Sequence, residues 1–287
     1  MEENPVSLIH VTHVRRLSPH MVRITFGGAG LDTFATWPDQ QLKLCFPRPG
    51  QSVPRLPEPD PDGDAMRWYQ ALLAIPEDER PYMRSYTVRA HHPEQHLIDI
   101  DFLLHDNGGP ATRWALSARP GDTLGRYGPS AVYARPLGDA DWYLFAGDQS
   151  ALPAIGTLLE SLPEGARAAA YIEVADAAEE QRFATRAEVT VHWVHRGAVP
   201  PGHGDALVRA VRGAAFGPGR VFAWLAGEAG TVRTLRRHLL QERGLDKRSV
   251  DFTGYWRLKL TQDDAPTAED LAEAQERLAQ AQEEQRG

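Results

Sequence analysis

The sequence has 287 residues, of which 42% are hydrophobic and 24% charged, so one large or two ordinary folded domains are expected. A formal net charge of −8 argues against an electrostatic binder of nucleic acid, which would carry a basic face. The single cysteine, Cys45, excludes an internal disulfide and a cysteine-clustered metal or iron–sulfur site, and we expect a buried structural thiol. No run of about 18 apolar residues predicts a membrane helix, and the first residues lack signal-peptide character, so we expect a cytoplasmic protein.

The first half of the chain has the pattern of short β-strands separated by Gly, Pro and Asp. The proline-rich residues 47–64 predict an exposed loop, and Pro110 predicts the first turn of a short helix whose Trp114 faces inward. Six short strands with turn signals favour a small antiparallel barrel. The expected strands are Val6 to Leu17, His20 to Phe26, Gln41 to Phe46, Arg84 to Ala90, Leu97 to Leu104 and Thr123 to Tyr127.

From Trp142 onward the pattern changes to alternating strands and helices, which is typical of a parallel sheet with covering helices. We expect the domain boundary between Pro136 and Asp141. The expected strands are Tyr143 to Ala146, Ala168 to Val174, Val189 to Val194, Val221 to Ala226 and Val250 to Trp256. The expected helices are Ser150 to Leu162, Asp205 to Ala215 and Thr231 to Arg243.

Residues 266–287 predict an Ala/Glu/Gln-rich helix with Thr267 as its N-cap and Asp270 three residues later, close to a capping box. Its narrow apolar stripe, which includes Leu271, predicts a solvated helix docked lightly on its own domain. Residues 263–287 carry eight acidic and two basic side chains, a net charge of −6. The rest of the chain therefore has a net charge of only −2, which leaves room for a local basic pocket.

Two segments of the first half have the chemistry of a flavin site. In the sequence Arg84-Ser85-Tyr86-Thr87-Val88, strand alternation places Arg84 and Tyr86 on one face. An arginine fork binds a pyrophosphate bidentately, a tyrosine ring packs on an isoalloxazine, and a threonine hydroxyl hydrogen-bonds its edge. The alternative is an ordinary strand with a surface arginine and a core tyrosine. In the second segment, His105 to Trp114, glycines allow close approach to a phosphate and the following helical turn favours an anion.

Taken together, six segments resemble the siderophore-interacting protein family, the FAD-binding ferric-siderophore reductases, from about residue 8 to about residue 260. The resemblance implies a ferredoxin-reductase-like fold, in which an N-terminal antiparallel six-stranded β-barrel precedes a Rossmann-like parallel α/β domain with a C-terminal helix. We expect an FAD-binding domain at 1–138, an NAD(P)H-binding domain at 139–262 and an acidic helical extension at 263–287. The segments are Leu42 to Leu44, Trp68 to Val88, His105 to Trp114, Ala146 to Ala154, Leu225 to Glu228 and Gly254 to Arg257.

The resemblance also implies the residues around each ligand. Those around FAD are Arg84, Ser85, Tyr86, Thr87, Val88, Asp101, Leu103, His105, Gly109, Pro110, Ala111, Thr112, Trp114, Asp148, Ser150 and Ala151. Those around the nicotinamide cofactor are Gly147, Asp148, Glu173, Gly227 and Glu228. Those around the chelate are Lys43, Arg126, Arg257 and Lys259. We expect no metal bound by the protein itself.

No G-x-G-x-x-G fingerprint or P-loop occurs in the chain, so the nicotinamide site depends on strand-end position and on the resemblance. For both strand-end segments the alternative is ordinary helix capping. The choice between NADPH and NADH stays open: Arg196 would suit a 2′-phosphate, whereas Glu173 at a strand end would suit a ribose hydroxyl.

The predicted function is therefore reduction of a ferric siderophore, either a hydroxamate or a catecholate, by electrons from NADPH or NADH through FAD. Cationic side chains suit such acceptor-rich or anionic chelates. A ferredoxin is a second candidate donor, and we expect a monomer without nucleic-acid or membrane partners. Two alternatives remain, a general flavin reductase or oxygenase reductase component, and a siderophore-binding protein without catalysis.

Overall fold

A computed structural model describes most of the chain, and it contains two compact units, residues 1–134 and 135–287. The predicted boundary after residue 138 lies close to this division, and residues 129–136 lie outside the described part. Among the described residues, no helix has the length and apolar character needed to cross a membrane. The described residues are 6–33, 36–60, 62, 64–105, 108–128, 137–261, 264–265, 267–273 and 275–276.

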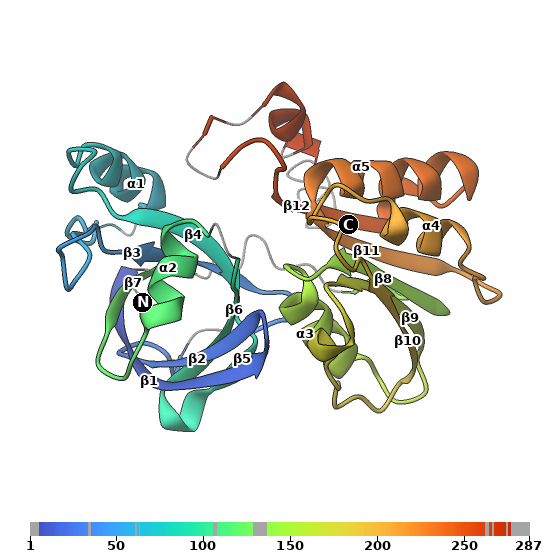
Figure 1. The fold of residues 1–287 in the computed structure, drawn as a ribbon, viewed down its shortest axis with the longest axis horizontal. Coiled ribbons are helices and arrows are strands. Elements are labelled where there is room, and N and C mark those ends of the chain that lie inside the picture. Colours follow the sequence, from blue (N-terminus) through green and yellow to red (C-terminus); the bar gives the residue numbers. More distant parts are fainter. Residues whose placement is uncertain are drawn as a thin grey trace. The chain divides into compact units, whose positions relative to one another are not determined.

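The first unit is a curled antiparallel sheet with strand order β4-β3-β7-β1-β2-β6-β5 (Figure 1). The two edge strands, β4 and β5, are consecutive in the chain and are joined by Val88 and Arg89. The backbone N–H of Arg89 donates to the backbone oxygen of Asp99 on β6 at 2.8 Å, so this bent segment links both edges of the sheet. The strands are β1 (Val6–Ser18), β2 (Met21–Gly27), β3 (Gln41–Phe46), β4 (Tyr82–Thr87), β5 (Ala90–His92), β6 (Leu97–Leu103) and β7 (Thr123–Tyr127).

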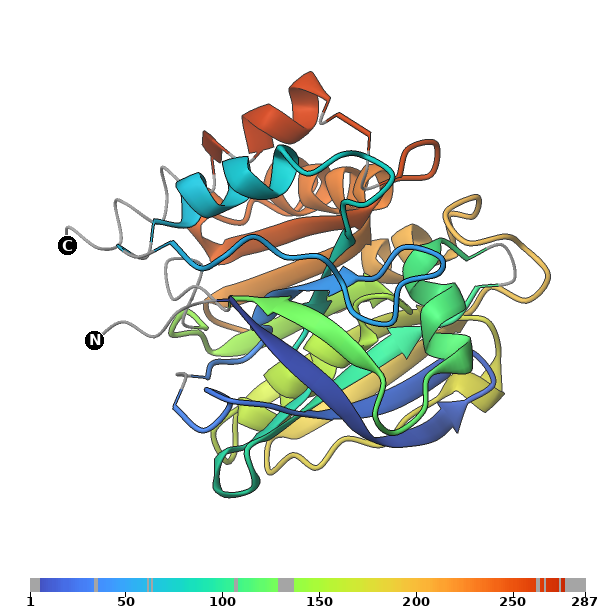
Figure 2. The ribbon, with the colours of Figure 1, turned by 90° about the vertical axis from the view of Figure 1, so that its left-hand side faces the viewer.

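The barrel confirms the predicted antiparallel architecture, with one difference in strand count. The predicted strand Arg84 to Ala90 is divided into β4 and β5, because the chain bends at Val88 and Arg89 to pass from one edge of the sheet to the other. The long β1, which Figure 2 shows as a strongly bent strand, changes register twice along its pairing with β2, as β-bulges do. Fully buried apolar side chains such as Ile24, Phe26 and Leu44 fill the interior.

Two helices pack on the barrel. The predicted short helix is α2 (Pro110–Ser117), and its Trp114 packs against the core as expected. The other, α1 (Ala65–Leu73), was not predicted; it begins at an Asp64 cap and covers Cys45 with Trp68. Cys45 is fully buried, as predicted, and burial raises the pKa of its thiol to about 12.

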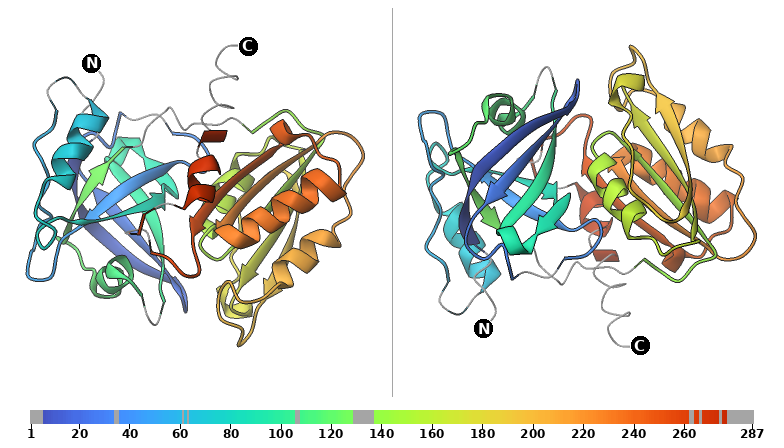
Figure 3. Two further views of the ribbon diagram at one scale, coloured as in Figure 1. Left: turned by 90° about the horizontal axis from the view of Figure 1, so that it is seen from above. Right: turned by 90° about the horizontal axis from the view of Figure 1, so that it is seen from below.

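The second unit is a five-stranded parallel sheet with strand order β10-β9-β8-β11-β12, as the alternating pattern predicted. Figure 3 shows α4 and α5 on one face of this sheet and α3 on the other. No α-helix joins β9 to β10; a short 3₁₀ turn, Ala177–Glu179, lies there instead. The elements are β8 (Trp142–Asp148), α3 (Leu152–Ser161), β9 (Arg167–Val174), β10 (Glu188–His195), α4 (Ala206–Arg212), β11 (Val221–Glu228), α5 (Ala229–Arg237) and β12 (Val250–Trp256).

Candidate functional site

The predicted flavin segment lies on β4, an edge strand of the barrel sheet. Val88 donates its backbone N–H to the backbone oxygen of Gln40 at 2.8 Å, which makes this a hydrogen-bonded pair of the β3–β4 ladder. Because such pairs alternate along an antiparallel ladder, the backbone groups of Met83, Ser85 and Thr87 point to the open edge. An edge of this kind offers backbone donors and acceptors to a ligand.

Arg84 and Tyr86 share one face of β4, as predicted from strand alternation. The guanidinium of Arg84 donates to the backbone oxygen of Met83 at 2.8 Å, at the open edge. The ring of Tyr86 lies 4.4 Å from the ring of Phe102, and burial raises the pKa of its phenol, which therefore stays neutral. Val88 is buried in the barrel core.

The two predicted flavin segments meet at one aromatic cluster. Trp114 of α2 lies 5.6 Å from Phe46 and 5.9 Å from Phe102, and Tyr86 of β4 contacts the same two rings. Phe46 and Phe102 are only 1% and 0% exposed, so no flavin ring can enter between them.

The first turn of α2 is open to an anion. Gly109 is the N-cap, no side chain caps the helix, and a Cβ on Gly109 would meet no atom within 4 Å. A Cβ on Gly108 would lie 2.3 Å from the Cβ of Thr112, so this position needs a glycine. Uncapped first-turn amides next to open space suit a phosphate. The predicted residues Pro110 and Ala111 form this turn.

Three other predicted FAD residues have different surroundings. Asp101 is buried and paired bidentately with Arg23 of β2, at 2.7 and 2.8 Å, so its carboxylate holds two strands together instead of facing a ligand. The backbone oxygen of Leu103 accepts a 3.4 Å hydrogen bond from Thr112. His105 is exposed next to the α2 turn.

Lys43 and Arg126, the predicted chelate residues of this unit, differ in accessibility. Lys43 is exposed, its Nζ lies 3.3 Å from the hydroxyl of Ser85, and partial desolvation lowers its pKa. Its side chain shares a face with Ser85, opposite to the face of Arg84. Arg126 is only 4% exposed and donates to Ser7 Oγ and to a backbone oxygen, so the structure argues against a chelate contact for it.

In the second unit the predicted nicotinamide residues lie at the carboxyl edge of the parallel sheet. Here β8 lies between β9 and β11, which is the switch point where ligands bind in open α/β sheets. Asp148 connects three elements: its Oδ2 accepts from the backbone N–H of Glu228 at 2.7 Å and from Trp256 Nε1 at 2.8 Å. Its Oδ1 accepts from the backbone and hydroxyl of Ser150, followed by the buried Ala151.

Two glycines allow the strands to approach at this edge. A Cβ on Gly147 would lie 2.6 Å from the backbone oxygen of Ala226. Gly227 has a φ of +136°, and a Cβ there would lie 2.6 Å from Asp148 Oδ2. Both positions are therefore explained by packing, and their predicted contact with a nicotinamide stays a prediction.

Two predicted carboxylates at the same edge are directed toward the protein. Glu228 caps α5 by accepting from the backbone N–H of Thr231 at 2.7 Å. Glu173 is 9% exposed; burial, together with the charge of Asp148, raises its pKa against the opposing effect of Arg196. Glu173 thus offers little surface to a ribose hydroxyl, whereas Arg196 is partly exposed.

The remaining predicted chelate residues follow β12. Lys259 is exposed, but Arg257 donates to Asp270 at 2.8 Å and to the backbone oxygen of Thr261 at 2.8 Å. Arg257 therefore holds the segment that leads to the C-terminal helix. Its charge is partly neutralised by the acidic extension.

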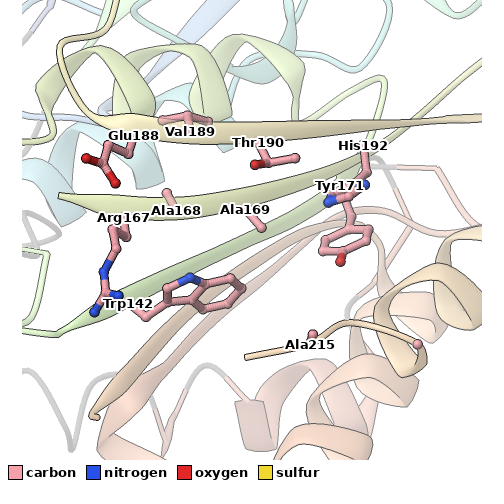
Figure 4. A pocket seen from close by; sticks show the side chains of 11 residues that line it. Trp142, Arg167, Ala168, Ala169, Tyr171, Glu188, Val189, Thr190, His192 and Ala215 are labelled. Atoms are coloured by element: carbon pink, nitrogen blue, oxygen red, sulfur yellow. The ribbon is translucent and has the colours of Figure 1, made fainter. Parts of the chain in front are cut away.

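A cavity of about 630 Å³ lies elsewhere in this unit. Figure 4 shows its lining, which includes Trp142, Arg167 and Glu188, the first residues of three strands. None of the candidate nicotinamide residues is among the described residues that line it.

Sequence reasoning did not assign a role to Trp256 or to Arg48. Trp256 holds Asp148 by donating its indole N–H to the carboxylate. A tryptophan at the end of a predicted strand was the feature of the sequence that could have indicated this role. Arg48 packs over Tyr82, which lies two residues before Arg84 and on the same strand face.

An antiparallel barrel with an open edge, followed by a parallel sheet with glycines at its switch point, defines the ferredoxin-reductase-like fold class. Among solved structures, ferredoxin NADP⁺ reductase from Neisseria gonorrhoeae shares this fold at a TM-score of 0.58 and 12% identity, covering 88% of this chain and all of that one.

The family is shown by closer matches. A family model described as siderophore-interacting FAD-binding domain matches residues 10–133, and one described as siderophore-interacting protein matches residues 140–259. The chain is 37% identical to the uncharacterized protein Rv2895c of Mycobacterium tuberculosis over 92% of this chain and 94% of the relative. It is 30% identical to ferric vibriobactin reductase ViuB of Vibrio cholerae over 87% of this chain and 89% of the relative.

A siderophore utilization protein from T. fusca has a TM-score of 0.76 and 37% identity, covering 90% of this chain and 95% of that one. The chain therefore belongs to the siderophore-interacting protein family, and it is an oxidoreductase whose cofactor is FAD. The open edge of β4 and the uncapped turn of α2 fit such a cofactor.

Proposed function

We propose that this protein reduces ferric siderophores with electrons from NAD(P)H through FAD. The observation that carries the proposal is the similarity along both units to relatives named for this activity, ferric vibriobactin reductase and, at 31% identity over 87% of this chain and 92% of the relative, the NADPH-dependent ferric-chelate reductase of Escherichia coli. One NAD(P)H reduces two ferric ions and releases one proton. Bound FAD supplies the exchange between two-electron and one-electron chemistry.

The barrel residues have the task of holding the cofactor. Arg84 binds the pyrophosphate, and the backbone groups of Ser85 and Thr87 hydrogen-bond the flavin at the open edge. Uncapped amides at Ala111 and Thr112 take up the remaining negative charge. None of these side chains needs to act as an acid or base.

The carboxyl edge of the parallel sheet has the task of holding the nicotinamide cofactor. Its shape depends on Gly147 and Gly227, which keep the strand ends close, and on Asp148, which joins β8, β11 and β12. Asp148 acts here by positioning the loops, since its two carboxylate oxygens are occupied by four donors.

The chelate is attracted by exposed positive charge. Lys43 is the best placed of the predicted residues because it is exposed and lies next to Ser85 of the flavin segment. Lys259 is exposed as well. Once iron is reduced, oxygen-donor chelators hold it less tightly, and Fe(II) is released. A ferredoxin donor, a monomeric state and a cytoplasmic location stay predictions.

The experiment is anaerobic stopped-flow reduction of the FAD-loaded protein with NADH and with NADPH, followed by mixing with ferric hydroxamates and catecholates in the presence of an Fe(II) trap. We expect the flavin absorbance to bleach on reduction by NAD(P)H. It should then return as the flavin is reoxidised, at the same rate as the Fe(II)–trap complex forms. If oxygen or free flavin reoxidised the reduced protein but no ferric chelate did so, the result would instead support a general flavin reductase. A protein that cannot be loaded with FAD would contradict the proposal outright.

A further inference from the structure

Arg48, in the loop after β3, stacks on an aromatic ring beside the proposed FAD site. Its guanidinium carbon lies 3.9 Å from the centroid of the Tyr82 ring, within the range of a cation–π contact. Its Nε donates to the backbone oxygen of Arg80 at 2.5 Å. These two contacts fix a long and flexible side chain in one orientation.

The same ring also lies near Arg84. The guanidinium carbon of Arg84 is 6.0 Å from the Tyr82 centroid, and Tyr82 and Arg84 share one face of β4. Two guanidinium groups therefore lie near a single ring at the start of the predicted flavin strand. Two positive charges beside the same ring raise the electrostatic potential there, which favours the binding of an anion.

Arg48 has no acidic partner in the part of the chain that the structure describes. Arg55, later in the same loop, by contrast pairs with Glu79. A partly buried guanidinium without a counter-ion is unfavourable, because the surrounding protein removes part of its hydration without supplying a negative charge. Such a charge suits an anionic ligand.

We propose that Arg48 is a second phosphate-binding arginine for FAD, held in place by Tyr82 and acting with Arg84. The pyrophosphate of FAD carries two negative charges, and Arg84 compensates for one of them. Arg48 supplies the second positive charge, with a fork that can bind bidentately. The inference rests on the FAD site proposed above.

The test is to titrate the apoprotein with FAD, FMN and riboflavin and to measure the dissociation constant of each from the change in flavin fluorescence. Removing one charge-assisted phosphate contact in Arg48→Ala should weaken FAD binding roughly 10-fold, while riboflavin, which has no phosphate, binds as before. Tyr82→Leu should weaken FAD binding in the same way, whereas Tyr82→Phe keeps the ring and should not. Arg55→Ala is the matched control, and its affinities should not change.

Salt gives a second readout, because added salt should weaken FAD binding less in Arg48→Ala than in the natural chain. If Arg48→Ala does not fold, Arg48→Met retains the apolar stem on Tyr82 and takes its place. An equal loss of FAD and riboflavin affinity would assign Arg48 a purely structural role and overturn the inference, as would unchanged FAD affinity. Natural apoprotein that binds no FAD would overturn the proposed site itself.

Discussion

Asp148 joins three secondary-structure elements through one carboxylate. Four donors converge on it, from Glu228, Trp256 and Ser150. An asparagine in its place would have one acceptor oxygen and one donor amide, so at least one of these donors would lose its partner. The carboxyl edge of the parallel sheet depends on this residue.

Asp148→Asn is therefore expected to lower the free energy of unfolding by about 1 kcal/mol, the lower end of the range for an unpaired donor, because these hydrogen bonds are only partly buried. It should also slow flavin reduction by NAD(P)H and leave FAD affinity unchanged. Denaturant titration and stopped-flow reduction measure the two effects. Asp205→Asn, at an exposed aspartate of α4 paired with Arg209, is the control and should alter neither.

Glu173 predicts a pH dependence of stability. Its pKa is raised in the folded state by burial, so the carboxyl binds a proton more tightly there than in the unfolded chain. Its contribution is fully present below the unfolded pKa and is lost as pH rises through the folded pKa. Glu173→Gln should thus be more stable than the natural chain at neutral pH and equal to it in acid. Urea titrations of both proteins over a pH series test this prediction. If Glu173→Gln were less stable than the natural chain at pH 7, the prediction would be wrong.

At the level of elements, the C-terminal helix is docked by charge. The capping box is confirmed, since Asp270 and Thr267 exchange hydrogen bonds at 2.8 and 3.2 Å. Leu271, the member of the apolar stripe that lies within the described residues, is 51% exposed and contributes little to docking. The helix instead pairs with basic residues of its own unit: Arg233 with Glu269, Asp270 and Glu273, Arg236 and Lys247 with Glu276, and Arg257 with Asp270.

Docking by ion pairs should be sensitive to salt, because screening weakens partly exposed pairs. We expect Arg233→Ala, which removes three pairs at Glu269, Asp270 and Glu273, to weaken docking by about 1 kcal/mol and to speed amide exchange in residues 268–276. Raising the salt concentration should do the same in the natural chain. Arg237→Ala, on the exposed side of α5, is the control. Exchange that is unchanged by both treatments would mean that another contact holds the helix.

Most strand and helix positions were predictable because they have a clear period or cap, but α1, which follows the proline-rich loop, was not predicted. The parallel sheet follows from apolar runs that are buried on both faces. The burial of Arg126 was not predictable, because it follows from a register that pairs Arg126 with Leu44, an interior residue. The bend after β4 depends on closure of the barrel, and the ion pairs of the helix depend on α5, which lies far away in the sequence. Both are tertiary effects that local pattern does not encode.

For the whole molecule, the proposed reaction divides into two halves with different residues in each. Reduction of the flavin by nicotinamide depends on the parallel-sheet unit, where Asp148 shapes the strand ends. Reoxidation by the chelate depends on positive charge in the barrel unit, where Lys43 is exposed next to Ser85. Because Lys43 and Asp148 share no hydrogen-bond or ion-pair partner within the described part of the chain, the effects of substituting them should be independent.

Lys43→Ala should lower kcat/KM for an anionic ferric chelate roughly 5-fold, the size expected when one exposed charge is lost from an encounter. Flavin content and the rate of flavin reduction by NAD(P)H should be unchanged, and adding Asp148→Asn should slow only that reductive step. Arg15→Ala, an exposed charge on β1, controls for net charge. Single-mixing and double-mixing stopped flow separate the two halves. If Lys43→Ala slowed reduction of the flavin, or if Arg15→Ala had the same effect on the chelate, Lys43 would have no specific part in binding the chelate.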